Sequence, residues 1–301
     1  MNVNKRLVVT IIPNWNLKVD LGECLDSLSH VTYPFHRVIV VDNASTDGSP
    51  ELVRDQYPWV ELITLPENIG YAGALNVGIA KALEWGAAYV LGLNNDTVMS
   101  PRTIQRMVEV MESDLATGIA SPKILHFYNP QKIYSLGERI YRWLPLPVSF
   151  GRGWPNLSIF SRIWDFDYVT GCAIMIRTSL FHEVGLFDPS FFMYYEDSDF
   201  CRRVRERGYR IVCVGDVEVY HKVSKSAKKR ANFIYRIRAR NRVRFYRRHR
   251  HGPHPLLTTM TLIIVAFYRS AIHILCGKSE LAWSYLLGLR DGLQEHTSIN
   301  R

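Results

Sequence analysis

The chain has 301 residues, of which 47% are hydrophobic and 22% charged, an ordinary globular composition with room for one large domain or two small ones. Its net charge of +9 is unevenly spread, because Val219 to Ser279 holds 15 of the 37 Lys and Arg residues and no Asp or Glu. The remainder, with 22 basic and 28 acidic residues, is acidic, so a local docking surface is indicated and a generally basic protein is excluded. The five cysteines form no Cys-x-x-Cys pair, which favours a reducing compartment and argues against a zinc site or a disulfide framework.

Apolar runs alternate with helical patterns along the first hundred residues. Buried strands are predicted at 7–12, 37–41, 60–64 and 89–93, and helices at about 22–29, 49–56 and 71–85. Strands and helices that alternate at this spacing form βαβ units. The sequence therefore predicts an α/β fold with a mostly parallel central sheet.

Two of the predicted strands end in a carboxylate and a polar loop. Asp42 opens the loop Asp42-Asn-Ala-Ser-Thr-Asp-Gly48, and Asn94, Asn95 and Asp96 follow the strand 89–93. Neighbouring parallel strands open into one crevice at their carboxyl ends. One carboxylate there can bind a nucleobase or ribose, while the other holds a divalent cation shared with a phosphate. Turn formation is the alternative use of such residues.

The pattern loosens beyond residue 121. Residues 127–164 are rich in Pro, Gly and aromatic side chains, which is typical of a loop with aromatic anchors in the core. A variable insertion that shapes an acceptor pocket is the alternative. A strand is then predicted at 168–176 with Gly171 inside it, and glycine within a strand often marks the close approach of a ligand or backbone.

An acidic cluster follows five mostly aromatic residues, 191–195. Glu196, Asp197 and Asp199 open a predicted helix that runs to about residue 207. Acids suit the first turn of a helix, yet aromatic neighbours would desolvate them and raise the pKa toward that of a useful general base. Glu196 and Asp197 are therefore the candidate catalytic residues. His221, at the end of a further strand, is a candidate ligand for Mn²⁺ or Mg²⁺, with surface packing as the alternative.

Motifs of other nucleotide-binding classes are incomplete in the sequence. No Gly-x-Gly-x-x-Gly follows a strand, and Gly277-Lys-Ser279 lacks the earlier glycine of a P-loop. A Gly-x-Ser-x-Gly elbow is also missing from the sequence.

Several short motifs occur in a recognisable order. They are Asp42-Asn-Ala-Ser-Thr-Asp-Gly-Ser49, Asn68-x-Gly70, Leu93-Asn-Asn-Asp-Thr97, Gly171-Cys-Ala, Gly185-Leu-Phe-Asp188, Glu196-Asp-x-Asp199 and His221. This set resembles the family 2 glycosyltransferases with the GT-A fold, especially their rhamnosyltransferase-like branch. The resemblance covers roughly residues 7–248.

The resemblance implies a role for each matching residue. The nucleotide of the donor would be bound by Pro13, Asn16, Asp42, Asn68, Gly70, Asn94 and Asn95. Asp96 and His221 would hold a divalent metal, Mn²⁺ or Mg²⁺, on the donor diphosphate. Asp197, beside Glu196, would deprotonate the acceptor hydroxyl in a direct, inverting displacement. Gly171 would lie near the acceptor. Lys222 and Lys225 do not match the family pattern, but they could grip the diphosphate in its place.

The sequence departs from the family pattern in two places. Asn94 replaces the first Asp of the family's Asp-x-Asp motif, which removes one charge near the metal. After His221, residues 222–226 replace the small Gly-Ser loop often found there.

The C-terminal region combines basic and apolar stretches. Residues 253–268 are uncharged and largely apolar until Arg269. As a helix they would rise about 24 Å, less than the roughly 30 Å hydrocarbon core. An interfacial or re-entrant amphipathic helix beside a polybasic patch is predicted, on an anionic cytoplasmic membrane surface. A tilted span and a buried core helix are the alternatives. RNA binding is not expected, because no nucleic-acid module accompanies the basic residues.

Together these features predict a GT-A domain at 1–221 and a basic, apolar, membrane-associated helical region at 222–301. The predicted enzyme is cytoplasmic, peripheral or monotopic at the membrane. It would transfer a sugar from a nucleotide-diphosphate donor, with dTDP-rhamnose suggested by the resemblance, to a lipid-linked or growing cell-surface glycan. A non-catalytic nucleotide-sugar-binding scaffold and a sugar nucleotidyltransferase are the alternatives. The nucleotidyltransferase alternative is weakened because this sequence has no glycine-rich triphosphate loop after the first strand.

Overall fold

The computed structural model describes residues 6–140, 147–223, 230–249 and 255–295. The described residues fall into two compact units. The N-terminal unit holds those up to 139, 149–192 and 196–223, and the C-terminal unit holds 193–195, a few residues around 140–148, and those from 230 onward. The short segment 193–195 therefore belongs to the C-terminal unit although the chain on both sides of it belongs to the other.

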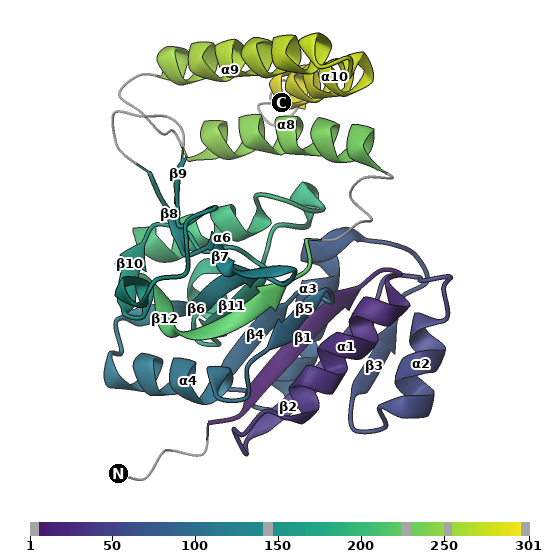
Figure 1. Ribbon diagram of the computed structural model, residues 1–301, viewed down its shortest axis with the longest axis vertical. Helices are drawn as coiled ribbons and strands as arrows, with labels where there is room; N and C mark the ends of the chain where they lie inside the picture. Colours follow the sequence, from purple (N-terminus) through teal and green to yellow (C-terminus); the bar gives the residue numbers. More distant parts are fainter. Residues whose placement is uncertain (1–5, 141–146, 224–229, 250–254, 296–301) are drawn as a thin grey trace. The chain divides into compact units, whose positions relative to one another are not determined.

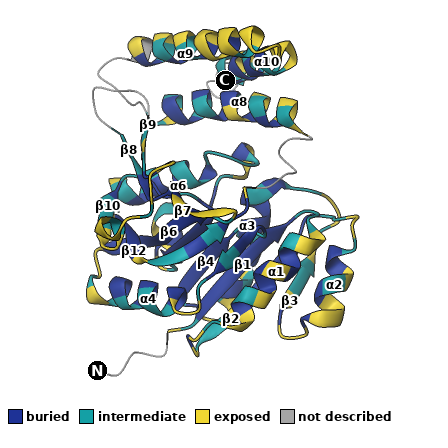
Figure 2. Cartoon of the chain, viewed as in Figure 1, coloured by how far each residue is buried: buried dark blue, intermediate teal, exposed yellow. Residues whose placement is uncertain are grey.

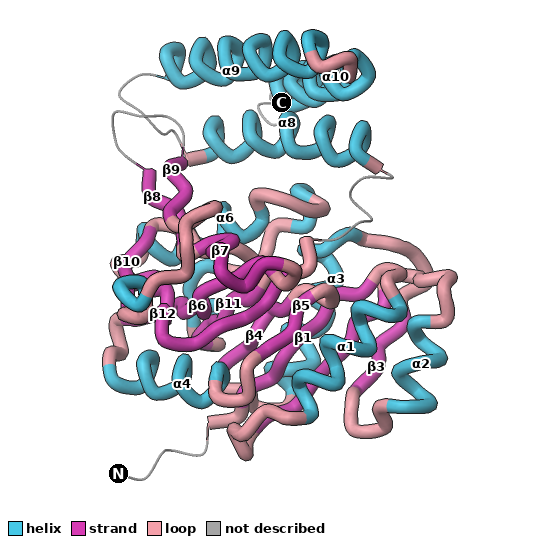
Figure 3. Tube along the Cα trace, in the orientation of Figure 1, coloured by secondary structure: helices cyan, strands magenta, loops and turns pink. Residues whose placement is uncertain are grey.

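The N-terminal unit is built on a long mixed sheet (Figures 1 and 3). Its strands are β1 (Val8–Asn14), β2 (His36–Asp42), β3 (Glu61–Thr64), β4 (Tyr89–Leu93), β5 (Thr97–Met99), β6 (Thr117–His126), β7 (Asn129–Ser135), β10 (Ile163–Phe166), β11 (Ala173–Arg177) and β12 (Arg210–His221). Two further strands, β8 (Gly137–Ile140) and β9 (Pro147–Phe150), pair with each other.

The sheet order is β10-β12-β6-β11-β4-β1-β2-β3, with β5 paired to β12 and β7 to β6. Strands β4, β1, β2 and β3 are parallel neighbours, and β6 is parallel to β12. Strand β11 runs antiparallel between β4 and β6. The predicted α/β fold with a mostly parallel central sheet is confirmed, with this one reversed strand at its centre.

Helices cover both faces of the sheet (Figure 1). They are α1 (Lys18–Ser29), α2 (Ser49–Gln56), α3 (Gly70–Glu84), α4 (Thr103–Ser113), α5 (Leu180–Val184) and α6 (Glu196–Glu206). Because side chains alternate along a strand, Val8 and Ile12 of β1 join Leu25 of α1 in the main core. The intervening Ile11 lies against α3, so closely that a Cβ on Gly78 would overlap it.

Two predicted boundaries differ from the structure. Strand β1 continues through Pro13 to Asn14, which is tolerated because β4 pairs with β1 only as far as Ile11. Gly171 precedes β11 and is not inside a strand, so the prediction of a strand at 168–176 was wrong there.

The region 127–164 contains short strands where the sequence predicts loop. Its aromatic side chains Phe150, Phe160 and Trp164 pack around a satellite cluster that includes Leu125 and Phe166. Aromatic burial holds these short strands in place despite the many Pro and Gly residues. The expectation of aromatic anchors in a core is confirmed.

The C-terminal unit is a bundle of α8 (Ala231–Arg248), α9 (Pro255–Leu275) and α10 (Ser279–Gln294). Ala239, Val243, Ala266, Tyr285 and Leu289 form its buried core. Helix α9 continues past Arg269, so it is longer than the run predicted from charge. Its 19 residues from Leu257 to Leu275 have a mean hydropathy of 1.5, long and apolar enough by length and composition to cross a membrane.

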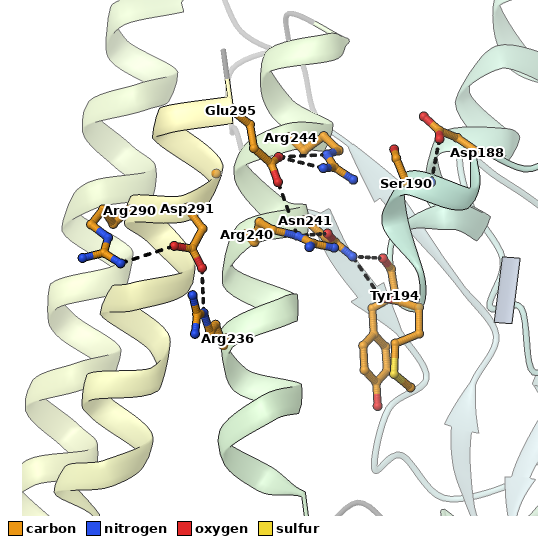
Figure 4. A network of polar contacts seen from close by, with 12 residues as sticks. Asp188, Ser190, Tyr194, Arg236, Arg240, Asn241, Arg244, Arg290, Asp291 and Glu295 are labelled. Carbon is orange, nitrogen blue, oxygen red and sulfur yellow. Dashed lines mark hydrogen bonds and ion pairs between the residues drawn. The ribbon is translucent and has the colours of Figure 1, made fainter. Parts of the chain in front are cut away.

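Several arginines of α8 are paired inside this unit (Figure 4). Arg236 contacts Asp291 at 2.6 Å, and Arg244 contacts Glu295 at 2.8 Å. Asp291 lies on α10 and Glu295 directly follows it. Both come after the basic stretch 219–279, which itself contains no Asp or Glu. Part of the charge that the sequence assigns to a docking surface is therefore neutralised within the bundle.

Candidate active site

A buried polar cluster lies at the carboxyl ends of β1 and β2. Register places Asn14 opposite Asp42, and the Asn14 amide donates to Asp42 Oδ1 at 2.8 Å. The other oxygen of Asp42 accepts the backbone N–H of Ser45 at 2.9 Å. Asp42 is only 2% exposed. Its two oxygens are thus held by the strand beside it and by its own loop, so its direction is fixed before any ligand arrives.

Asn95 extends this cluster from the loop after β4. Its amide donates to Asn14 Oδ1 at 2.7 Å and to the Asn16 carbonyl at 3.3 Å. The backbone N–H of Asn16 donates to Ser45 Oγ at 2.7 Å. Three loops that are far apart in sequence are therefore joined by side-chain amides. The structure brings Asn16, Asp42 and Asn95 together. Pro13 is buried in β1, next to Asn14.

The turn before α3 is held by asparagine side chains. Asn68 Oδ1 accepts the N–H of Gly70 at 2.9 Å, and Asn43, next to Asp42, donates to the Gly70 carbonyl at 3.3 Å. Gly70 has φ +81°, and a Cβ there would lie 2.5 Å from the Phe192 carbonyl oxygen. Glycine is therefore required at this position, both for backbone conformation and for space.

Asp96 and His221 meet although 125 positions separate them in sequence. Strand β5 pairs with the end of β12 and sets His221 opposite Thr97, which leaves His221 Nε2 3.1 Å from Asp96 Oδ1. Both side chains are buried. Burial alone would lower the pKa of His221, but Cys172 and Asp96 raise it to about 11. Without a metal the pair is an imidazolium next to a carboxylate, and a cation bound here would displace the imidazole proton.

This pair provides two of the ligands that a divalent cation needs. One carboxylate oxygen and one imidazole nitrogen at this separation suit Mn²⁺, and His221 Nδ1 is a buried atom without a hydrogen-bond partner in the described chain. Among the described residues no group of three or more His, Cys, Asp or Glu side chains could hold a metal. The donor set therefore fits a cation that also binds a phosphate ligand, and it does not form a complete protein cage.

The two lysines predicted to grip a diphosphate differ in status. The Lys222 ammonium lies 2.7 Å from both Asp20 and Glu23 of α1, so its charge is already neutralised by two carboxylates. Its backbone N–H donates to the Asp96 carbonyl at 3.0 Å. Lys225 lies outside the described residues.

Asp197, in the first turn of α6, is held by three donors. Its Oδ2 accepts the N–H of Gly171 at 2.8 Å, and its Oδ1 accepts the N–H and the hydroxyl of Ser198 at 2.7 and 3.2 Å. Burial raises the pKa of Asp197, and these hydrogen bonds oppose the rise. The result is an oriented carboxylate that is more basic than an ordinary aspartate.

Glu196 is placed differently from its neighbour. It is 5% exposed, and its Oε2 is buried without a hydrogen-bond partner among the described residues. Burial and the adjacent Asp197 raise its pKa well above the usual range. Glu196 therefore holds its proton more strongly than an ordinary glutamate does, and of the two acids Asp197 is the one whose carboxylate is oriented by hydrogen bonds.

Tyr71 is a site residue that the sequence did not single out. Its hydroxyl donates to the Gly171 carbonyl at 2.8 Å, on the glycine whose N–H holds Asp197. Burial raises the pKa of Tyr71 well above its usual range, and so do the nearby acids Glu196, Asp197 and Asp96. Tyr71 therefore lies near the two acids of α6 and also near Asp96.

Asn14 is the other residue that sequence reasoning missed. The signal that could have found it is that Asn14 closely follows the predicted strand 7–12, as Asp42 follows the strand 37–41.

The α/β sheet, with amides and carboxylates gathered at the ends of its parallel strands, has the GT-A fold found in solved glycosyltransferases. The mannosyltransferase PcManGT from Pyrobaculum calidifontis, solved with GDP-Man and Mn²⁺, shares the fold with a TM-score of 0.62 at 18% identity, over 97% of this chain and 89% of that one. GalNAc-T7, solved with UDP, GalNAc and Mn²⁺, has a TM-score of 0.57 at 15% identity, over 71% of this chain and 43% of that one.

The chain belongs to glycosyl transferase family 2, whose model matches residues 9–185. Within that family it is rhamnosyltransferase-like. It is 28% identical to the N-acetylglucosaminyl-diphospho-decaprenol L-rhamnosyltransferase of Mycobacterium tuberculosis (strain ATCC 25618 / H37Rv), over 67% of this chain and 71% of the relative. It is 24% identical to the dTDP-rhamnosyl transferase RfbF of Shigella flexneri, over 88% of each. The resemblance inferred from the motifs is confirmed.

Proposed function

We propose that this glycosyltransferase moves a sugar, with inversion, from a nucleoside-diphosphate donor to a hydroxyl of a lipid-linked or growing surface glycan. The observation that carries the proposal is the orientation of Asp197 by Gly171 and Ser198. Tyr71 donates to the carbonyl of the same Gly171, close to the acids Glu196, Asp197 and Asp96. The names of the two related rhamnosyltransferases support dTDP-rhamnose as the donor and a diphospho-lipid as the acceptor class.

Each part of the site has a distinct role in this proposal. Asp42, fixed by Asn14, accepts hydrogen bonds from the nucleobase or ribose of the donor. Asp96 and His221 would hold a divalent cation, which would supply positive charge to stabilise the leaving nucleoside diphosphate. Asp197 removes the proton of the acceptor hydroxyl while that oxygen bonds to the anomeric carbon and the sugar–phosphate bond breaks. No covalent nucleophile is needed.

We assign the membrane-facing role to helix α9. One side of α9 packs into the bundle through Leu262 and Ala266, which are 3% and 1% exposed. The opposite side carries an apolar stripe at helical spacing. Figure 2 marks the exposed residues of α9 in yellow. The stripe residues are Leu257, Met260, Ile264, Phe267, Tyr268 and Leu275, each more than half exposed. This amphipathic geometry supports a helix that lies in the interface of the cytoplasmic leaflet, where a lipid-linked acceptor would be found.

The test is a screen of nucleotide sugars for nucleoside-diphosphate release with Mn²⁺, Mg²⁺ or EDTA, on wild type and Asp197→Asn. We expect metal-dependent release with membrane lipid extract as acceptor. Loss of the base should lower the rate about 10²–10⁴-fold with nucleotide binding retained, as measured by calorimetry. Tight nucleotide binding without turnover would favour a non-catalytic scaffold. No nucleotide binding at all would reject the proposal.

A further inference from the structure

The turn that leads into α6 has an unusual backbone. Phe192, Tyr194 and Tyr195 have φ angles of 64°, 67° and 74°, in the left-handed region that side chains other than glycine rarely adopt. Three such residues in four positions are strained, and a strained turn persists only when its surroundings hold it. Asp197 follows two residues later.

Helix α8 supplies the groups that hold this turn. Asn241 is fully buried, and its amide donates to the carbonyls of Met193 and Tyr194 at 2.9 and 2.8 Å (Figure 4). Arg240 donates to Asn241 Oδ1 at 3.0 Å, which fixes the amide with its NH₂ group toward the turn. One side chain thus donates hydrogen bonds to two consecutive carbonyls of the strained turn.

The next residue of α8 holds the other end of the turn. Arg242 donates to the Tyr195 hydroxyl at 2.9 Å and to the Tyr285 hydroxyl of α10 at 3.0 Å. The Tyr195 ring also packs against Phe245, with centroids 5.6 Å apart. Residues 193–195 are therefore bound to α8 by backbone and side chain, up to the residue directly before Glu196.

We propose that Asn241 and Arg242 are positioning residues for the catalytic turn, holding the strained segment 193–195 so that Asp197 is presented in its productive orientation. This inference rests on the proposed function, because it takes Asp197 as the base. It assigns the C-terminal bundle a part in catalysis that is separate from membrane attachment. A shift of about 1 Å in a catalytic group can lower a rate by about 10²-fold, so the loss of either contact should be measurable.

The test compares Asn241→Leu with Arg236→Met, a control on the same helix that breaks only the exposed pair with Asp291. For Asn241→Leu we expect kcat for sugar transfer to fall about 10²-fold, with donor KM and the Kd for nucleoside diphosphate within about twofold of wild type. Hydrogen–deuterium exchange of a peptide covering 191–198 should accelerate about tenfold or more. The turn loses the two hydrogen bonds to its carbonyls, so it opens more often and its N–H groups meet solvent more often. The control should change neither.

A second variant guards against misfolding of the first. Tyr195→Phe removes only the hydroxyl that Arg242 binds, and it should lower kcat by a smaller factor, about three- to tenfold. Unchanged kcat and exchange in both variants would overturn the inference, and so would an equal loss of nucleotide affinity. The exchange measurement needs no substrate. If wild type transferred no sugar while exchange rose only in the turn, the hold of Asn241 on segment 193–195 would stand, but the proposed function would fail and with it the catalytic role of that hold.

Discussion

Glu196 and Asp197 show how one position along a helix changes the chemistry of a carboxylate. Asp197 has three hydrogen-bond donors on its two oxygens, whereas one oxygen of Glu196 is buried without a partner in the described chain. Hydrogen bonds to a carboxylate stabilise its charged form, and burial without them stabilises the neutral form. The two adjacent acids are therefore not interchangeable as bases.

Glu196→Gln should separate these roles. Native Glu196 keeps its proton to a higher pH than the unfolded chain does, because burial and Asp197 raise its pKa. The unfolded state then binds fewer protons, so the free energy of unfolding falls as pH rises above about 4.3. Glutamine does not titrate, so in the variant the free energy of unfolding should no longer fall with pH through this group. The decrease that disappears is about 1.4 kcal/mol for each unit by which the Glu196 pKa is raised.

Urea unfolding at pH 5 and pH 8 measures this difference. Activity at neutral pH should fall less than about fivefold in Glu196→Gln, against the 10²–10⁴-fold expected of a lost base. An equal loss in Glu196→Gln and Asp197→Asn would contradict the assignment of Asp197 alone as base.

At the scale of elements, the start of helix α3 is constrained from several sides. Gly70 has φ +81°, receives the Asn43 amide on its carbonyl, and faces the Phe192 carbonyl at a distance that admits no Cβ. Phe192 is the residue before the segment bound by α8. The turn that carries Asn68 is therefore packed against Phe192.

Gly70→Ala should destabilise the fold by about 2–4 kcal/mol, from the left-handed backbone and the displaced carbonyl together. Gly86→Ala, at the other end of α3, is a matched control. Gly86 has φ +70°, but a Cβ added there would meet no atom within 4 Å, so only the backbone cost of about 1 kcal/mol applies. Equal losses in urea unfolding would show that the contact with Phe192 contributes nothing.

At the scale of the whole molecule, charge and apolar surface in the C-terminal bundle have different uses. Arginines of α8 bind Asp291, Glu295 and the turn 193–195, while α9 leaves its apolar stripe exposed. Membrane binding should therefore depend on the stripe more than on the basic residues of α8.

The double variant Ile264→Glu/Phe267→Glu should weaken binding to anionic phospholipid vesicles about tenfold or more, because burial of each large apolar side chain is worth about 1.5–3 kcal/mol. Leu115→Glu, an exposed apolar residue of the N-terminal unit at 69% exposure, should bind like wild type. Vesicle sedimentation measures both. Undiminished binding by the double variant would reject the stripe as the membrane face. Self-association that the double variant abolishes would identify it as a subunit interface.

The sheet, the family and most of the residues around the site could be predicted from the amino-acid sequence. Buried strands and the polar residues that end them are local patterns, so Asp42, Asn95, Asp96 and Asp197 could be found by reading along the chain. Their order carried the resemblance to family 2 because motif spacing is also a property of the sequence.

What these residues contact became known only from the folded chain. The pairing of His221 with Asp96 depends on β5 joining the end of β12, and the hold on Asp42 by Asn14 depends on strand register. Tyr71, Asn241 and the partners of Lys222 are set by elements distant in sequence. Such contacts follow from how strands and helices pack, and no local pattern encodes them, because a polar side chain has the same sequence signature whether it meets water, a backbone carbonyl or another side chain.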